Sequence, residues 1–391
     1  MDPTTLIGPS SPLGYPAPYW FLLFFKVLGF TLHIVPMNLW YAGTILAMLI
    51  SWRGGEHEKH LATRLMRQMP IIVAYGVNFG IIPLLFTQVA YYKVFYPSTI
   101  LMAWAWLSII LLLMLAYYGV YIYAAGLRDG GTRMTRFKQV AGWVAALLFI
   151  VIGFLFANNF SLMTNLRAWA ALWQTTSVAG APMGTALNTA DPTLWPRWLM
   201  MFGLAITTTA TYIVVDTTFF ARKGSPQRTD GAAPVTGEEQ ETYTRWATGF
   251  ALKLYTVGII WFAITGSWYV FGTWPAEQRQ MMLSGSLTIL TVLTAVGPGL
   301  PWFLIFVSWR RGVTQGLALG TGLAQFGVLT LNAISRQVVQ NAELREFLDV
   351  TAEQVNVQWS PMILFLMLFV AGIGVIAWMI SRLRLTARQS S

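Results

Sequence analysis

The sequence has no cysteine and only three histidines among 391 residues. Without thiols the chain can form no disulfide, thiolate metal site, iron–sulfur cluster or covalently attached c-type haem. Charged residues are also scarce, at 10% of the chain, against about 25% in soluble domains. Few positions can therefore face bulk water, and no segment has the composition of a soluble domain.

The formal charge of +10 does not indicate nucleic-acid binding, because the basic residues fall in short segments between apolar runs. No cleavable signal peptide is evident, since the apolar run after Tyr19 is too long and no basic segment precedes it. The 18 tryptophans and 24 phenylalanines fit aromatic belts at two membrane interfaces. The composition thus predicts a protein whose surroundings are membrane lipids.

Hydrophobicity is concentrated in long runs, and spanning ~30 Å of hydrocarbon takes about 20 apolar residues. Backbone groups in lipid must be paired internally, so such runs form helices. The sequence predicts an all-α polytopic helix bundle forming one membrane domain over residues 1–391. The nine predicted transmembrane helices are 19–51, 69–92, 99–126, 139–160, 195–221, 246–272, 284–309, 313–335 and 358–382.

Lysine and arginine alternate between the two sides of this arrangement, seventeen on one side and six on the other. The basic side is expected in the cytoplasm, with the N-terminus outside, the C-terminus inside, and the protein multi-pass in a bacterial inner membrane. Residues 161–194 are predicted as a long outer loop, 222–245 as a polar inner linker, and 337–357 as a short amphipathic helix on the outer surface.

Ionisable groups within a membrane are costly, so each is a functional candidate. His33 lies well inside the first run, where it either ligates a haem or bonds to a neighbouring helix. Lys26 is close enough to the outer end for its side chain to reach the interface. Asp216 lies in the inner half of the fifth run. The runs contain no buried glutamate and no acidic chain of the kind that proton-coupled carriers use.

Several uncharged or terminal positions form a possible polar site: Asn78 in GVNFG, Gln88, and Arg336-Gln337 at the outer end of the eighth run. Arg336 is expected to contact lipid headgroups or an acidic residue of 343–353. Gly297-Pro298-Gly299-Leu300-Pro301 is expected to break or kink the seventh helix. Asn158-Asn159 is expected to cap the fourth. His57 and His60 have no third ligand nearby, so no metal site is predicted.

The order of these features resembles subunit I of the cytochrome bd-type quinol oxidases. His33-Ile34-Val35-Pro36 with the later Gly43 is similar to that family's haem-ligating histidine, proline and glycine. Residues 76–80 (GVNFG), 157–160 (ANNF) and 335–339 (SRQVV) are similar to its Asn-Phe, Asn-Gly-Trp and Gly-Arg-Gln-Pro-Trp motifs. The resemblance implies a nine-helix bundle with its N-terminus outside and a haem ligand at His33.

The departures from that family imply lost oxygen chemistry. Met200 stands where the family has a low-spin haem histidine, a residue near Leu290 where it has a methionine ligand, and Ala333 where it has a haem-associated glutamate. Acidic residues are missing from the third helix, and the quinol loop is reduced to about 273–283. Only His33 keeps a family haem donor, while Met200 is a weaker candidate for the same role.

The sequence and the resemblance together leave several functions open. The leading one is a non-oxidase membrane subunit of a respiratory or photosynthetic electron-transfer complex, not catalytic alone, whose partners include other subunits and a c-type cytochrome on the outer face. A second is a relay subunit that holds one b-type haem at His33 and interacts with quinone. A third is a transporter or channel using Asn78, Gln88 and Asn332, and a fourth is a purely structural assembly subunit.

Overall fold

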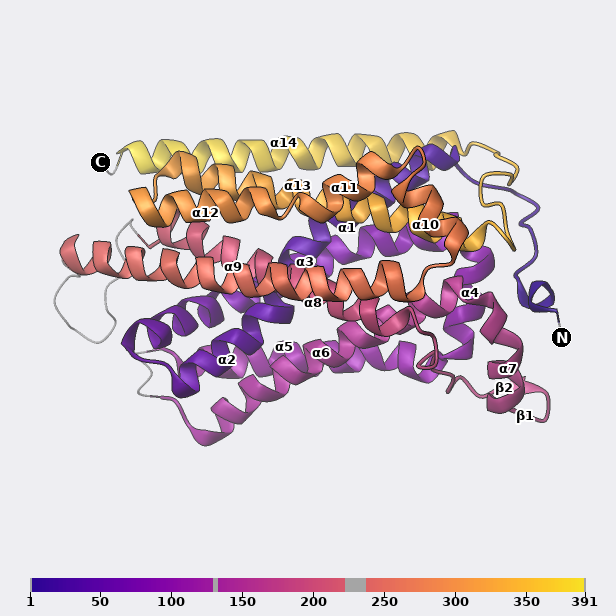
Figure 1. Ribbon diagram of the computed structural model, residues 1–391, viewed down its shortest axis with the longest axis horizontal. Helices are drawn as coiled ribbons and strands as arrows, with labels where there is room; N and C mark the ends of the chain where they lie inside the picture. The colour runs from indigo at the N-terminus through magenta and orange to yellow at the C-terminus, as the bar shows by residue number, and fades with distance from the viewer. Residues whose placement is uncertain (1, 129–132, 222–236, 390–391) are drawn as a thin grey trace.

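The structure is a computed structural model, which describes residues 2–128, 133–221 and 237–389. It is a bundle of long helices that run side by side, with the chain termini at opposite ends (Figure 1). We call these ends the N-terminal end and the C-terminal end of the bundle. The predicted linker 222–245 falls largely outside the described residues.

The helices follow the predicted apolar runs and differ from them at several boundaries. Their bounds are α1 Tyr19–Asn38, a π-helical turn Leu39–Gly43, α2 Thr44–Arg53, α3 Glu56–Ala90, α4 Tyr92–Leu101, α5 Ala103–Gly126, α6 Arg136–Thr164, α7 Leu166–Thr176, α8 Leu194–Phe219, α9 Gly237–Thr273, α10 Ala276–Leu283, α11 Thr288–Val296, α12 Gly299–Arg311, α13 Gln315–Leu344 and α14 Trp359–Gln389. The short 3₁₀-helix Pro3–Leu6 precedes them, and β1 (Ser177–Val178) pairs with β2 (Ala181–Pro182) in an antiparallel hairpin.

Within the described residues, eight helical stretches are long and apolar enough to cross a membrane. The first joins α1, the π turn and α2, and the seventh joins α11 and α12. α14 is a further helix, whose Phe365 and Phe369 pack on Phe25 of α1. Its apolar part, Trp359–Val375, is shorter. Large apolar side chains such as Ile110, Leu147 and Ile264 are more than 60% exposed, as expected for a surface that contacts lipid.

Local chemistry explains where the helices begin and bend. The Thr135 and Thr314 hydroxyls accept backbone N–H groups at the starts of α6 and α13, which is the standard N-cap. Pro36 lies inside α1 just before the π turn. An interior proline removes a backbone donor and disturbs the helix, which accounts for the irregular turn that follows. The predicted break of the seventh helix is confirmed, because α11 ends at Val296 and α12 begins at Gly299.

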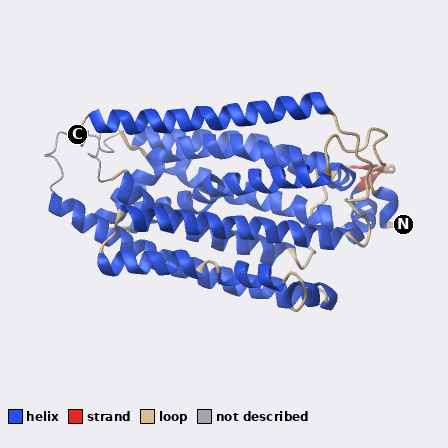
Figure 2. Cartoon of the chain, turned by 90° about the horizontal axis from the view of Figure 1, so that it is seen from above, coloured by secondary structure: helices blue, strands red, loops and turns tan. Residues whose placement is uncertain are grey.

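Three local expectations are wrong. Asn158 and Asn159 do not cap α6, which continues to Thr164, and both side chains are buried within it. Residues 337–357 do not form a separate helix: α13 extends to Leu344, and the segment after it turns back to pair beside Tyr15. The stretch 161–194 is not all loop, since it contains α7 and the hairpin, which lies at the same end as the N-terminus (Figure 2).

Packing in the bundle is pairwise. α1 lies along α3, α5 along α6, and α8 along α9, while α13 packs against α8, α1 and α12. α11 differs from its neighbours because none of its residues is buried and it packs mainly on α13 and α10. α9 contacts α12 but makes little contact with α11. α9 and α11 therefore separate toward the N-terminal end.

Candidate functional site: a side-opening cavity and the polar groups around it

His33 lies at the interface of α1 and α3. Its Nδ1 is 2.8 Å from the Gly76 carbonyl oxygen, so the ring donates that hydrogen bond when Nδ1 carries the proton. The ring lies against Gly80, where an added Cβ would come within 2.8 Å of Cε1, and edge-on to Trp40 at 5.9 Å between centroids. The GVNFG glycines therefore give the backbone of α3 close access to two large rings of the first helix.

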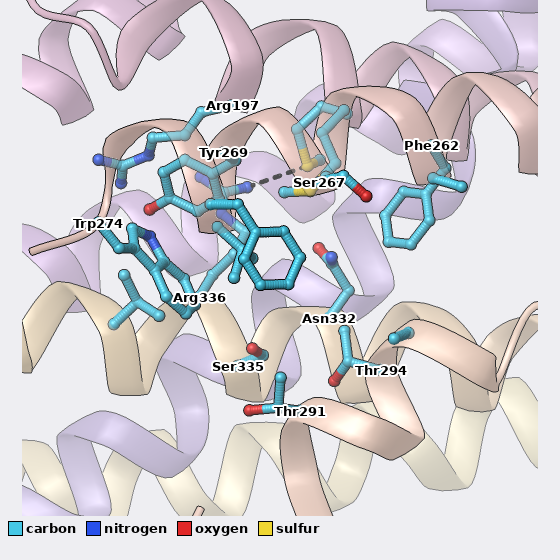
Figure 3. A pocket seen from close by; sticks show the side chains of 18 of the residues that line it. Arg197, Phe262, Ser267, Tyr269, Trp274, Thr291, Thr294, Asn332, Ser335 and Arg336 are labelled. Atoms are coloured by element: carbon cyan, nitrogen blue, oxygen red, sulfur yellow. Dashed lines mark hydrogen bonds between the residues drawn. The ribbon is translucent and has the colours of Figure 1, made fainter. Parts of the chain in front are cut away.

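A cavity of about 290 Å³ opens between α9 and α11 toward the N-terminal end of the bundle, near the lower end of the usual ligand-pocket range of about 300–1,000 Å³. It is lined on α8 by Met200 and Met201, on α13 by Asn332 and Arg336, and on α9 by Phe262 among others. Figure 3 shows Arg197, Tyr269 and Trp274 gathered at one end of this space and Phe262 at the other.

The cavity opens sideways, at the depth of the membrane-crossing helices. Ala263 and Ser267 on α9 and Ala295 on α11 line it and are exposed. Because α11 buries none of its residues, the opening faces the surroundings of the bundle and not its core. A ligand entering here would come from the membrane.

Two arginines line the polar end of the cavity, and only one of them is paired with a carboxylate of the described residues. Arg197, in the first turn of α8, is paired with Glu343 at 3.2 Å. The Arg336 guanidinium has no acidic partner among the described residues: its contacts are the Met201 sulfur at 3.6 Å and the face of the Phe30 ring, 4.8 Å away. The expectation that Arg336 pairs with an acidic residue of 343–353 is wrong for the described residues, because Arg197 takes Glu343.

Gln337 belongs to a different cluster. Its carbonyl accepts from Lys26 Nζ at 2.5 Å, and its amide donates to the Tyr91 hydroxyl at 2.5 Å. Lys26 also donates to Gln340 at 3.0 Å and lies over the Tyr91 ring. Lys26 is only 8% exposed, so the interpretation that its side chain reaches the membrane interface is wrong. The two glutamines of α13 solvate this cation inside the protein.

Asn78 and Gln88 do not join the cavity. Asn78 is exposed, and its amide donates to the Ala74 carbonyl of its own helix. Gln88 is half-buried on α3. Asn332 does line the cavity and is 2% exposed, with an Oδ1 atom that has no hydrogen-bond partner. The three amides therefore do not lie along one path.

Several polar contacts were missed by the sequence analysis. Asp216 is bound by Arg64 through Nε (2.7 Å) and Nη2 (2.9 Å), and by the Gln68 amide at 2.9 Å. Arg64 reads as a loop residue but lies in the third turn of α3. Arg197 falls within the predicted helix 195–221, but its pairing with Glu343 was not predicted.

The comparisons with known proteins support the fold. No family model matches the chain, and no curated protein matches it by sequence. Among solved structures, one chain of the bd oxidase from Geobacillus thermodenitrificans is similar in fold, with a TM-score of 0.57 over 93% of this chain and 97% of that one. The two are 13% identical, so the likeness supports a distant relationship in fold and does not extend to activity.

His33 and Met200, which the resemblance implies as donors at two different haem positions, lie in different surroundings. His33 faces α3, where its ring contacts are Gly76, Gly80 and Trp40, none of which supplies a second iron ligand. Met200 lines the cavity between α9 and α11, beside Met201 and two arginines, and His33 does not line it. The cavity thus offers thioethers but no imidazole, and the two donors do not share one space.

Proposed function

We propose that this chain is a non-oxidase integral membrane subunit of an electron-transfer complex, and that its partner carries the redox centres. The observation that carries this proposal is the packing of His33, the one family haem donor that the sequence keeps. Its ring is held between α1 and α3 by the hydrogen bond to Gly76 and the close contact with Gly80, and it does not line the cavity. The bd oxidase-like fold supplies the association with electron transfer.

The proposed orientation places the N-terminal end of the bundle outside a bacterial inner membrane, because lysine and arginine are concentrated at the other end. We propose that the partner, a c-type cytochrome or another subunit, docks on the N-terminal end. Val178 and Met183 of the hairpin region are 62% and 47% exposed there. Exposed apolar side chains outside the membrane-crossing segments are typical of protein contacts.

A reduced-minus-oxidised visible spectrum of the purified full chain, beside the variants His33→Ala and Met200→Leu, tests the absence of a haem. We expect no b-type band in any of the three proteins. A band present in the unsubstituted chain and lost in His33→Ala would overturn the proposal and establish a haem-carrying relay subunit.

Co-purification from native membranes tests the partner. We expect the affinity-purified chain to retain a haem-containing protein, detected by its absorbance and by mass spectrometry. Val178→Asp should weaken this retention, whereas Phe220→Asp, a similarly exposed position at the C-terminal end, should not. Equal retention in both variants would exclude docking on the hairpin. If deletion of the chain leaves electron flow through the complex unchanged, the chain is a purely structural subunit.

A further inference from the structure

The cavity between α9 and α11 combines an apolar interior with a cation that pairs with no carboxylate of the described residues. The charged groups close enough to act on Arg336 are Arg197, Glu343 and Lys26. The Glu343 carboxylate is already paired with Arg197. On the far side of Arg197, Asp191 accepts from Ser161 and Asn188 and does not reach Arg336. A cation that is largely removed from water needs a counter-charge or strong hydrogen-bond acceptors. The half-buried Arg336 has neither among the described residues, where its contacts are the Met201 sulfur and the Phe30 ring.

Two further polar groups on the wall are poorly satisfied within the described residues. The Oδ1 of Asn332, a residue 2% exposed, accepts no hydrogen bond. The indole N–H of Trp274, a residue 6% exposed, lies beside the Tyr269 hydroxyl but makes no hydrogen bond of normal geometry. Buried polar groups are normally satisfied, so unpaired groups around a cavity indicate something that binds there. The Arg336 guanidinium and the Trp274 indole N–H are hydrogen-bond donors, so a ligand that satisfies them must carry an acceptor.

Polarity changes along the cavity in one direction. Arg197 lies in the first turn of α8, and Trp274 directly follows α9, so both are at the N-terminal edge of the bundle. Phe262, Ala263 and Ala295 lie deeper and are apolar. Tryptophan is typical of the membrane–water interface. The site is therefore polar at headgroup depth, apolar below it, and open to the side through Ala263 and Ala295.

We propose that this cavity binds one anionic phospholipid from the surrounding leaflet, with its phosphate on Arg336 and the Trp274 N–H, and an acyl chain between α9 and α11. Guanidinium groups hold phosphate through charge-assisted hydrogen bonds. A neutral ligand such as a quinone would fill the apolar part and leave the Arg336 charge unbalanced. The proposal requires only that the chain lies in a membrane, so it stands independently of the function proposed above.

Native mass spectrometry of the delipidated full chain in detergent tests the site directly. The added probes are phosphatidylglycerol, phosphatidylcholine with the same chains, inorganic phosphate and a long-chain quinone. We expect phosphatidylglycerol to bind at 1:1 and phosphatidylcholine about tenfold or more weakly, since only the former is anionic. Tight binding of inorganic phosphate alone would point to a soluble anion and overturn the lipid proposal.

Two variants with matched controls locate the binding. Arg336→Gln should lose the preference for phosphatidylglycerol, whereas Arg167→Gln, at the same end but exposed and outside the cavity, should keep it. Ala263→Phe should block the opening without touching either arginine, whereas Ile264→Phe, on the neighbouring exposed position that does not line the cavity, should not.

The outcomes are distinct. Loss of the phosphatidylglycerol preference in Arg336→Gln, together with loss of binding in Ala263→Phe and with both controls unchanged, would establish the site. If one variant folds poorly, the other still tests the proposal, because the two substitutions change different parts of the cavity wall. Binding that is equal for the two phospholipids, or that survives both variants, would overturn the proposal. So would a quinone that binds the unsubstituted chain in preference to phosphatidylglycerol and is lost in Ala263→Phe.

Discussion

Replacing Asp216 with alanine should destabilise the protein by removing the centre of a buried ion pair. The carboxylate accepts three hydrogen bonds, two from Arg64 and one from Gln68. The Asp216 side chain is 3% exposed and that of Arg64 is 14% exposed. Breaking such a pair by removing one partner costs about 3–5 kcal/mol, because the remaining charge is left desolvated and unpaired.

The expected magnitude can be separated into coupling and individual costs by a double-mutant cycle with Arg64→Ala. The free energy of unfolding is measured for the four proteins in mixed micelles of increasing SDS content. We expect the double variant to lose less than the sum of the two single variants, by about 1–3 kcal/mol. Single costs that add to within about 0.5 kcal/mol would refute the pairing as a source of stability.

Three further substitutions follow from the same reasoning and the same unfolding measurement. Gly80→Ala should lower the free energy of unfolding by about 1–3 kcal/mol, because the new methyl group overlaps the His33 ring. His33→Ala in the same chain should recover part of that loss. No recovery would contradict the close packing of the two residues. Arg167→Ala should leave the unfolding midpoint nearly unchanged, since its pair with Glu346 is exposed and screened by solvent. A clear loss would show that its contact with the Phe347 ring is stabilising. Gly14→Ala should be destabilising, because Gly14 has a φ of +65° and faces a backbone carbonyl, whereas an unchanged protein would show that this turn relaxes freely.

Eight of the nine predicted membrane-crossing helices correspond to described stretches that are long and apolar enough to span a membrane, whereas the ninth, 358–382, falls on α14, whose apolar part is shorter. The eight were predictable because each requires about 20 apolar residues and the charges fall between such runs. The break at Gly297-Pro298 was predictable for a similarly local reason, since proline cannot donate to the helix. The residues at which the helices begin and end were harder to predict. α3 begins at Glu56 and α6 continues past Asn159, because tertiary contacts stabilise polar helical turns that hydropathy alone assigns to loops.

In the candidate site, too, the residues could be identified from the sequence, but their contacts could not. His33, Met200 and Arg336 were identified from residue type and position, but which space each occupies depends on how the helices pack. Lys26 was expected to reach water, yet two glutamines more than 300 positions away in sequence bind it. Arg64 and Asp216 are 152 positions apart. Pairings over such separations leave no pattern within either segment.

The broken seventh span makes one wall of the cavity sensitive to the membrane itself. α11 has nine residues and α12 thirteen, so they are about 13 Å and about 20 Å long. α11 buries none of its residues, and little burial opposes a tilt of this half-helix about Gly297-Pro298. A bilayer thinner or thicker than the hydrophobic length of the span is accommodated by tilting, and here the tilt falls on the shorter, loosely packed half. Bilayer thickness would then set the width of the opening, and with it which acyl chains can enter.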